Sequence, residues 1–330
     1  MKEWLERYLT ALWYSQRRPP LWLRALVPIY RVVATPRWRP SSERPPCPVI
    51  VVGNITVGGS GKTPVVAALA RLLAQAGHAP AVISRGYGGQ GADEPRAVTP
   101  SSDPAAVGDE PVLLARRAGC AVWVCRDRRA ALDAARSGGA DVVLSDDGLQ
   151  HPRLPRSYEI CVIDGLRGLG NGCLLPAGPL RQPVHRLDSV DEVLVKQAGG
   201  EAVEPPAAGQ PFAVEPGRPY LLGADRSADA FPAQAEFDAV CAIGNPDSFF
   251  ALLEALGYRF RARPFPDHHA FGVDDLTAME GPLLVTEKDA VKLERLVGLP
   301  RTWVLPIEAR LPDPVCAAVL AHVREFPKHE

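Results

Sequence analysis

The stretch VVGNITVGGSGKTPVV, residues 51–66, limits the possible folds of this chain more than any other. It begins inside an apolar run, residues 49–52, that is typical of a buried parallel strand. The glycines Gly58, Gly59 and Gly61 follow, and Lys62 and Thr63 then open a segment with apolar residues at helical spacing. Backbone N–H groups bind phosphate in this context of strand, glycine-rich loop and helix. The stretch therefore predicts a nucleotide phosphate site in an α/β fold.

The loop departs at one position from the pattern G-x-x-x-x-G-K-[ST], because Thr56 stands where the first glycine is expected. The three inner glycines shape the cradle, Lys62 adds a positive charge at the outer phosphates, and the Thr63 hydroxyl can reach Mg²⁺. The alternative is a plain glycine turn between strand and helix, and the Lys-Thr pair in this context argues against it. The predicted nucleotide-binding residues are Thr56, Gly58, Gly59, Ser60, Gly61, Lys62 and Thr63.

Strand-like and helix-like segments alternate after the loop, which predicts a parallel sheet flanked by helices. A stretch rich in Gly, Pro and Glu, residues 198–219, indicates a linker or ribbon between domains. Strand and helix patterns resume at Phe237. We therefore expect an N-terminal amphipathic helical arm over residues 1–46, a P-loop domain over 47–200 and a smaller α/β domain over 201–330.

The overall charge is nearly balanced, with 37 Lys and Arg against 38 Asp and Glu in 330 residues. The total therefore gives no support for a nucleic-acid partner. The seven cysteines form no C-x-x-C pair, and no export signal precedes them. We expect reduced thiols in a cytoplasmic protein.

The charge is unevenly distributed along the chain. Residues 1–40 carry eight basic and two acidic side chains, a net charge of +6, whereas the whole chain has a net charge of −1. Four of the six tryptophans also lie there: Trp4, Trp13, Trp22 and Trp38. Amphipathic indoles beside cations favour contact with an anionic lipid surface. No apolar run reaches the ~20 residues of a spanning helix, and the sequence RRPP at residues 17–20 interrupts the arm.

An alternative is that the arm is an N-terminal helix packed on its own domain. Leu5, Leu9, Leu12 and Trp13 would then face the core. We favour contact with the membrane surface over this alternative.

Two adjacent carboxylates, Asp146 and Asp147, end the apolar run that begins at Val142. A nucleotide loop needs a carboxylate at the end of another buried strand to order its metal ion, and both side chains can approach Mg²⁺ or its waters from there. A solvated turn is the alternative, and the preceding loop argues for the metal role.

Two further polar residues have open interpretations. Asp109, in the sequence GDEP, opens an apolar helix, so it is either a plain N-cap or the base that takes a proton from an attacking hydroxyl. His268, in the sequence FPDHH, lies either in a polar turn or in a site between the domains. The residues alone do not decide between these roles.

Eight motifs in the same chain resemble those of the tetraacyldisaccharide 4′-kinases of lipid A biosynthesis. In chain order they are VVGNITVGGSGKTPVV, SRGYGG, GDEP, LSDDGLQH, LPAGPLR, GNPDSFF, FPDHHAF and TEKDAVK, and they span residues 49–292. The resemblance implies a Mg²⁺-ATP kinase that phosphorylates the 4′-hydroxyl of an acylated glucosamine disaccharide 1-phosphate. It also implies peripheral association with the anionic lipid surface at the cytoplasmic face of the bacterial inner membrane. Family members share the threonine at the position of Thr56.

The resemblance assigns roles to individual residues. Lys62 and Thr63 match the phosphate and Mg²⁺ residues, and Asp109 and His268 match the proposed base and the histidine that pairs with it. The acidic motif near the metal matches Asp146, Asp147 and Gln150. Further active-site positions match Glu110 and Arg181, and Tyr87 is expected to face the lipid headgroup.

One position departs from the family, which often has Arg-Glu where this chain has Arg181 and Gln182. Either the negative charge is not required, or another residue supplies it. The alternative function is a membrane-associated regulatory P-loop ATPase that acts as a switch. Its loop resembles K-G-G-x-G-K-T, but Val57 stands here in place of the signature lysine.

Overall fold

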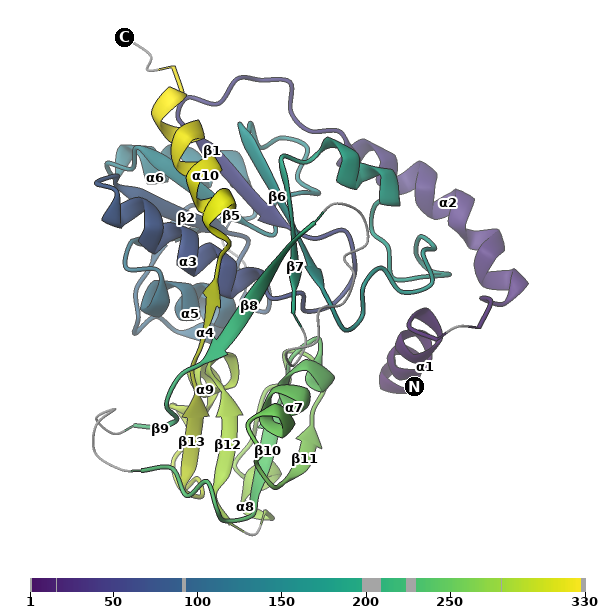
Figure 1. Cartoon of the computed structure of the whole chain (residues 1–330), viewed down its shortest axis with the longest axis vertical. Coiled ribbons are helices and arrows are strands. Elements are labelled where there is room, and N and C mark those ends of the chain that lie inside the picture. Colours follow the sequence, from purple (N-terminus) through teal and green to yellow (C-terminus); the bar gives the residue numbers. More distant parts are fainter. Residues whose placement is uncertain are drawn as a thin grey trace.

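A computed structural model of the chain describes residues 2–15, 17–90, 93–197, 209–223, 230–279 and 281–327. Two sheets organise these residues, a large one in the upper body of Figure 1 and a small one below it. The strand order of the large sheet is β14-β8-β7-β6-β1-β5-β2-β4-β3, and that of the small sheet is β11-β10-β12-β13-β9. The strands at the centre of the large sheet are parallel and have helices on both faces, which confirms the predicted P-loop α/β fold.

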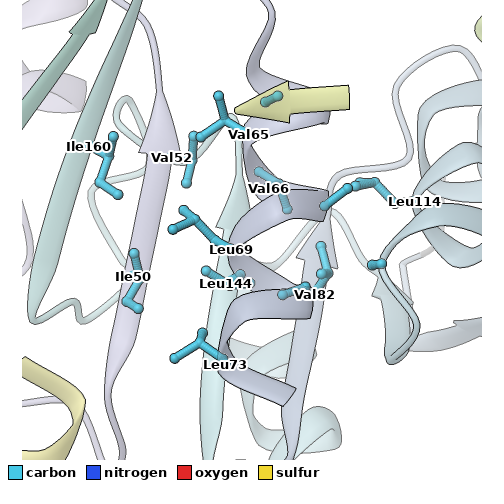
Figure 2. Close-up of a cluster of buried hydrophobic side chains, with 14 of the residues drawn as sticks. Ile50, Val52, Val65, Val66, Leu69, Leu73, Val82, Leu114, Leu144 and Ile160 are labelled. Carbon is cyan, nitrogen blue, oxygen red and sulfur yellow. The ribbon is translucent and has the colours of Figure 1, made fainter. Parts of the chain in front are cut away.

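The centre of the large sheet positions the loop. Strand β1 (Val49–Gly53) lies between β5 (Val142–Asp146) and β6 (Tyr158–Asp164), and all its pairings are parallel. Helix α3 (Lys62–Gln75) follows the loop and packs on the sheet with Leu69 and Leu73, both fully buried. Figure 2 shows these leucines between α3 and the strands that carry Ile50 and Leu144. The register sets Val52 beside Asp146, so the loop and the acidic strand end lie at the same sheet edge.

Helices cover both faces of this sheet. One face packs against α3, α5 (Asp109–Arg117) and α10 (Asp313–Glu325), and the other packs against α6 (Arg128–Ser137). The other elements of this part before residue 197 are β2 (Pro80–Ser84), β3 (Arg96–Val98), α4 (Pro104–Val107), β4 (Ala121–Val124), η1 (Val184–Ser189) and β7 (Glu192–Lys196).

The small sheet is a second α/β unit. Its strands are β9 (Tyr220–Leu221), β10 (Phe237–Cys241), β11 (Phe260–Pro264), β12 (Leu283–Thr286) and β13 (Thr302–Leu305). Its helices are α7 (Pro246–Ala255), α8 (Asp274–Thr277) and α9 (Glu287–Leu293). All strands except β9 run parallel, as the repeated strand and helix patterns after Phe237 predict.

The chain returns to the large sheet after β13. Strand β14 (Ile307–Arg310) pairs antiparallel with β8 (Gln210–Pro216), and α10 then packs on the core of the larger part. Strands β8 and β14 therefore belong to the large sheet and α10 packs on its core, although all three lie beyond the predicted boundary at residue 200. Within the predicted linker, residues 210–216 form a strand of that sheet, while residues 198–208 lie outside the described residues.

The N-terminal arm consists of α1 (Lys2–Trp13) and α2 (Leu21–Trp38), which lie at one side of the large body (Figure 1). The end of α1 is anchored, because the Trp13 Nε1 donates to the Pro176 carbonyl at 2.9 Å. Leu5, in contrast, is 44% exposed. The alternative of a packed helix thus holds for Trp13 and not for Leu5.

Helix α2 leaves an apolar face uncovered. Only Leu23 and Ala34 of this helix are buried, and the Tyr30 hydroxyl donates to the Arg181 carbonyl at 3.0 Å. The uncovered face, which we name the α2 stripe, consists of Leu21, Trp22, Leu26, Ile29, Val32 and Val33. Among the described residues, no helix has both the length and the apolar character needed to span a membrane.

Candidate active site

The glycine-rich loop connects the end of β1 to the first turn of α3, as its sequence predicts. Gly58 and Gly61 adopt φ angles of 101° and 87°, which residues other than glycine rarely adopt. Lys62 is the first residue of α3, so its backbone lies at the helix N-terminus, where unpaired N–H groups attract anions. The Ser60 hydroxyl is buried and has no hydrogen-bond partner among the described residues.

Thr56 lies outside this cradle. It is 7% exposed and forms a backbone bridge with Leu180, while Val57 donates its N–H to the Pro179 carbonyl at 2.9 Å. A cavity lies beside the loop, and residues 57–64 line it, whereas Thr56 is not among its lining residues. Thr56 thus supports the loop through its backbone, and its predicted contact with nucleotide stays a prediction.

The two adjacent aspartates have different surroundings. Asp146 ends β5, and its buried Oδ1 has no hydrogen-bond partner among the described residues. Burial and the nearby Glu110 raise the pKa of Asp146 to about 7, against the opposing effect of Lys62. Asp147 adopts a φ of 51° and pairs with Arg181 at 2.9 Å and Lys62 at 3.6 Å. Burial raises the pKa of Asp147, but these two cations outweigh burial and hold the pKa below its usual range.

Amide side chains brace the same edge of the sheet. Arg181 donates to both the backbone and the side-chain oxygen of Asn54, the first residue after β1. Gln150 donates its Nε2 to the Asn54 carbonyl and to the Gln182 Oε1, both at 2.8 Å. Gln182 is fully buried and serves as an acceptor for Gln150, a role that an uncharged amide can fill. The Gln150 Oε1 stays buried without a partner among the described residues.

Asp109 and His268 meet across the two parts of the molecule. The His268 Nδ1 lies 3.2 Å from the Asp109 Oδ2, while the Asp109 Oδ1 accepts the Glu110 N–H at 2.9 Å. Asp109 is 5% exposed and is the first residue of α5, whose N-cap is Gly108. His268 adopts a φ of 60°, a strained angle for a residue other than glycine. The sequence predicts both residues as candidates, and the structure brings them together.

The pKa of Asp109 is lowered and the pKa of His268 is raised. Burial raises the pKa of Asp109, but the hydrogen bond from His268 and the charges of Lys288 and Lys292 outweigh it and lower the pKa overall. Burial lowers the pKa of His268, but the hydrogen bond to Asp109 outweighs it and raises the pKa overall. The arrangement favours an ionised Asp109 beside the imidazole.

Glu110 and Tyr87 border this pair. The Glu110 Oε1 accepts from the Lys288 Nζ at 3.0 Å. The Tyr87 ring lies 4.9 Å from the His268 ring, measured between centroids, and Tyr87 is 63% exposed. Sequence reasoning missed Lys288 and Asn54 as site residues, although both lie in motifs that carry the family resemblance.

A cavity of about 1210 Å³ joins these groups. Its lining comes from the large part, the small part and α2, and it includes residues 57–64, Arg37, Tyr87, Glu110, Asp146, Asp147, Gln150, Arg181, His268 and Lys288. The backbones of the two parts approach closely, because a Cβ placed on Gly244 would lie 2.7 Å from the Gly59 nitrogen. The small part therefore closes directly over the loop.

A phosphate cradle on β1 and α3, beside an acidic strand end and under a second domain, defines a P-loop kinase fold. A family model described as tetraacyldisaccharide-1-P 4′-kinase matches residues 19–324. The tetraacyldisaccharide 4′-kinase of Alkalilimnicola ehrlichii is 49% identical over 318 residues, with 93% of each chain covered. The one from Halorhodospira halophila is 50% identical over 285 residues, which cover 86% of this chain and 83% of that protein. The chain belongs to the tetraacyldisaccharide-1-P 4′-kinase family and is a kinase.

A solved structure agrees with this assignment. The crystal structure of LpxK from Aquifex aeolicus in complex with ATP superposes with a TM-score of 0.71 and 27% sequence identity. The match covers 91% of this chain and 98% of that chain. The family resemblance and the fold predicted from the sequence are thus confirmed.

Proposed function

We propose that this kinase transfers the γ-phosphoryl group of ATP to the 4′-hydroxyl of a tetraacylated glucosamine disaccharide 1-phosphate. The bond between the acceptor oxygen and the γ-phosphorus forms, the bond from that phosphorus to the β-phosphate bridge breaks, and ADP leaves. The product is the 4′-phosphorylated precursor of lipid A. The observation that carries the proposal is the Asp109–His268 pair, assembled across two domains at the cavity that also contains the phosphate loop. The identity of the acceptor in this proposal comes from the name of the family to which the chain belongs.

The loop residues bind the nucleotide in this proposal. Backbone N–H groups of residues 58–61 surround the phosphates, and the Lys62 ammonium neutralises charge on the outer ones. Lys62 is positioned for this because it opens α3 and is held by Asp147 at 3.6 Å. Arg181, which shares that carboxylate, adds a second cation near the transferred group.

The chemistry of the donor set fits Mg²⁺. Thr63, Asp146, Asp147 and Gln150 offer only oxygen ligands, which Mg²⁺ prefers. Asp146 Oδ1 and Gln150 Oε1 are both buried and unpartnered among the described residues, so each has a free lone pair for a cation or its water. When bound, Mg²⁺ would neutralise developing charge on the phosphates.

Asp109 acts as the base. A sugar hydroxyl is a poor nucleophile at neutral pH, so a carboxylate must accept its proton as the new bond forms. His268 orients this carboxylate through its contact with the Asp109 Oδ2. Glu110 and His268 line the cavity, and Asp109 is buried beside them, so the hydroxyl meets Asp109 once these two side chains make room.

The acceptor enters from the side of the arm. Arg37 of α2 lines the cavity, and Tyr30 of the same helix contacts Arg181. The α2 stripe, with Arg24 and Arg31 also exposed on this helix, fits the headgroup region of an anionic bilayer. We infer that α2 lies on the cytoplasmic face of the inner membrane and directs the lipid headgroup towards Tyr87.

Dependence on the acceptor tests this function. We expect little ADP release from ATP and Mg²⁺ alone, and rapid release when a tetraacyl disaccharide 1-phosphate is added in mixed micelles. A regulatory ATPase would release ADP at the same rate with and without the lipid. Asp109→Ala should bind nucleotide normally and lose the stimulation by lipid.

A further inference from the structure

Lys288 lies at the contact between the two parts of the molecule, beside the Asp109–His268 pair. It is the second residue of α9, and its side chain is 14% exposed. Its Nζ lies 3.0 Å from the Glu110 Oε1, 3.3 Å from the Asp267 Oδ1 and 3.4 Å from the His268 Nε2. Glu110 belongs to α5 of the large part, whereas the other two partners belong to the small part.

These three contacts match the three donors of a lysine ammonium. Burial lowers the pKa of Lys288, but the carboxylates of Glu110, Asp109 and Asp267 outweigh burial and raise the pKa, so the group stays cationic. An ammonium carries no lone pair, so in a hydrogen bond across this contact the His268 Nε2 is the acceptor. A neutral imidazole with Nε2 as acceptor carries its proton on Nδ1, which faces the Asp109 Oδ2 at 3.2 Å.

We propose that Lys288 is a positioning residue of the kinase reaction, which fixes His268 as the neutral tautomer with its proton on Nδ1. His268 then donates to Asp109 without transferring a charge to it, and Asp109 stays an ionised base. Lys288 also ties this state to domain closure, because one of its partners lies on the opposite domain. This inference rests on the proposed role of Asp109 and His268.

Removal of the Lys288 charge has a defined direction. The charged and titratable groups facing His268 are Asp109 from α5, Lys288 from α9, Asp267 from its own loop and the Tyr87 ring. The His268 Nε2 also lies 3.7 Å from the Asp267 Oδ1, so removal of the Lys288 charge leaves His268 between two carboxylates. Its pKa then rises further, the imidazolium persists to higher pH, and the pKa of Asp109 also rises because a neighbouring cation is lost.

The pH profile of kcat separates this role from a purely structural one. We expect Lys288→Met to move the acid limb of kcat by about one pH unit or more towards higher pH, the size typical of a charge at this distance. Lys288→Arg keeps the cation and should keep the acid limb near its wild-type position. The matched control is Arg116→Met, because Arg116 of α5 pairs at 2.8 Å with Glu294, the C-cap residue of α9, and does not contact His268 or Asp109 in any described interaction.

The outcomes distinguish the inference from the proposed function. A wild-type enzyme that transfers no phosphate to the lipid refutes the function itself. An active wild type, with a Lys288→Met variant that loses rate equally at all pH values, refutes the role of Lys288 alone and reduces it to a tie between domains. If the acid limb of kcat shifts as far in Arg116→Met as in Lys288→Met, the proposed role of Lys288 is also overturned.

A measurement on the wild-type protein covers the case in which Lys288→Met does not fold. The ¹⁵N ring signals of His268, assigned by their loss in His268→Asn, identify which nitrogen carries the proton. We expect protonated Nδ1 and bare Nε2 at pH 7.5. The opposite tautomer in the wild-type protein would overturn the proposal without any Lys288 variant.

Discussion

The α2 stripe offers a test whose magnitude follows from the structure. Ile29 and Val32 are 61% and 75% exposed, so each still has most of its side chain to transfer from water into lipid. Full burial of such a side chain contributes about 1.5–3 kcal/mol, and these exposures reduce that to about 1–2 kcal/mol each. The double variant Ile29→Ser, Val32→Ser should therefore bind vesicles about 2–4 kcal/mol more weakly, a roughly thirty- to thousandfold lower partition coefficient.

The assay is sedimentation with vesicles of anionic phospholipid at fixed ionic strength, with thermal unfolding recorded in parallel. Val297→Ser is the matched control, because Val297 is 89% exposed but lies in the small part, far along the chain from α2. We expect the control to bind like the wild type and the double variant to keep its unfolding temperature. A double variant that partitions like the wild type would refute the assignment of α2 to the membrane surface. Unfolding of the double variant would instead indicate that the stripe is covered in the folded protein.

Two further predictions concern the chemistry. Lys62→Ala and Thr63→Ala should each abolish useful turnover, because phosphoryl transfer depends on positioning and charge neutralisation; near-normal turnover in either variant removes the loop from the mechanism. For the pair at 3.2 Å, Asp109→Ala and His268→Ala should each depress kcat strongly with near-normal nucleotide affinity, and the double variant should be little worse than the worse single one. Fully multiplicative losses would mean that the two residues act independently.

The elements of the fold that are encoded within short segments could be predicted from the sequence. The apolar run before the loop, the helical spacing after it and the strand ending at Asp146 are each complete within a short segment, and the structure has all three. The return of the chain to the large sheet could not be predicted in this way. Strand β14 pairs with β8, which lies about ninety residues earlier, and such pairing leaves no pattern within either segment.

The same distinction applies to the site. Motif spacing predicts Lys62, Thr63 and Asp146 as site residues, because the loop and the neighbouring strand end meet in parallel sheets of this type. Lys288 has a polar helical sequence around it, and only the contact between α5 and α9 shows that it faces Glu110 and His268. The α2 stripe could likewise not be predicted, since the sequence does not show which apolar residues of a helix stay exposed.

Thr56 has surroundings that differ from those expected for a nucleotide contact. Its position in the loop predicts contact with nucleotide, but its backbone turns towards Leu180 and its side chain is buried. A residue can thus belong to a binding motif through the support it gives to the loop. Threonine at this position leaves the loop geometry intact, because Gly58 and Gly61 still adopt positive φ angles.

Transfer of label from [γ-³²P]ATP to a tetraacyl disaccharide 1-phosphate tests the proposed reaction most directly. The enzyme, Mg²⁺ and the lipid are incubated, the lipid is extracted, and the labelled position is mapped by mild acid hydrolysis, which releases the anomeric phosphate first. We expect one labelled phosphate per lipid, resistant to that hydrolysis and located on the 4′-oxygen, with none formed by Asp109→Ala. Label released only as inorganic phosphate at a rate independent of the lipid would contradict the proposed reaction.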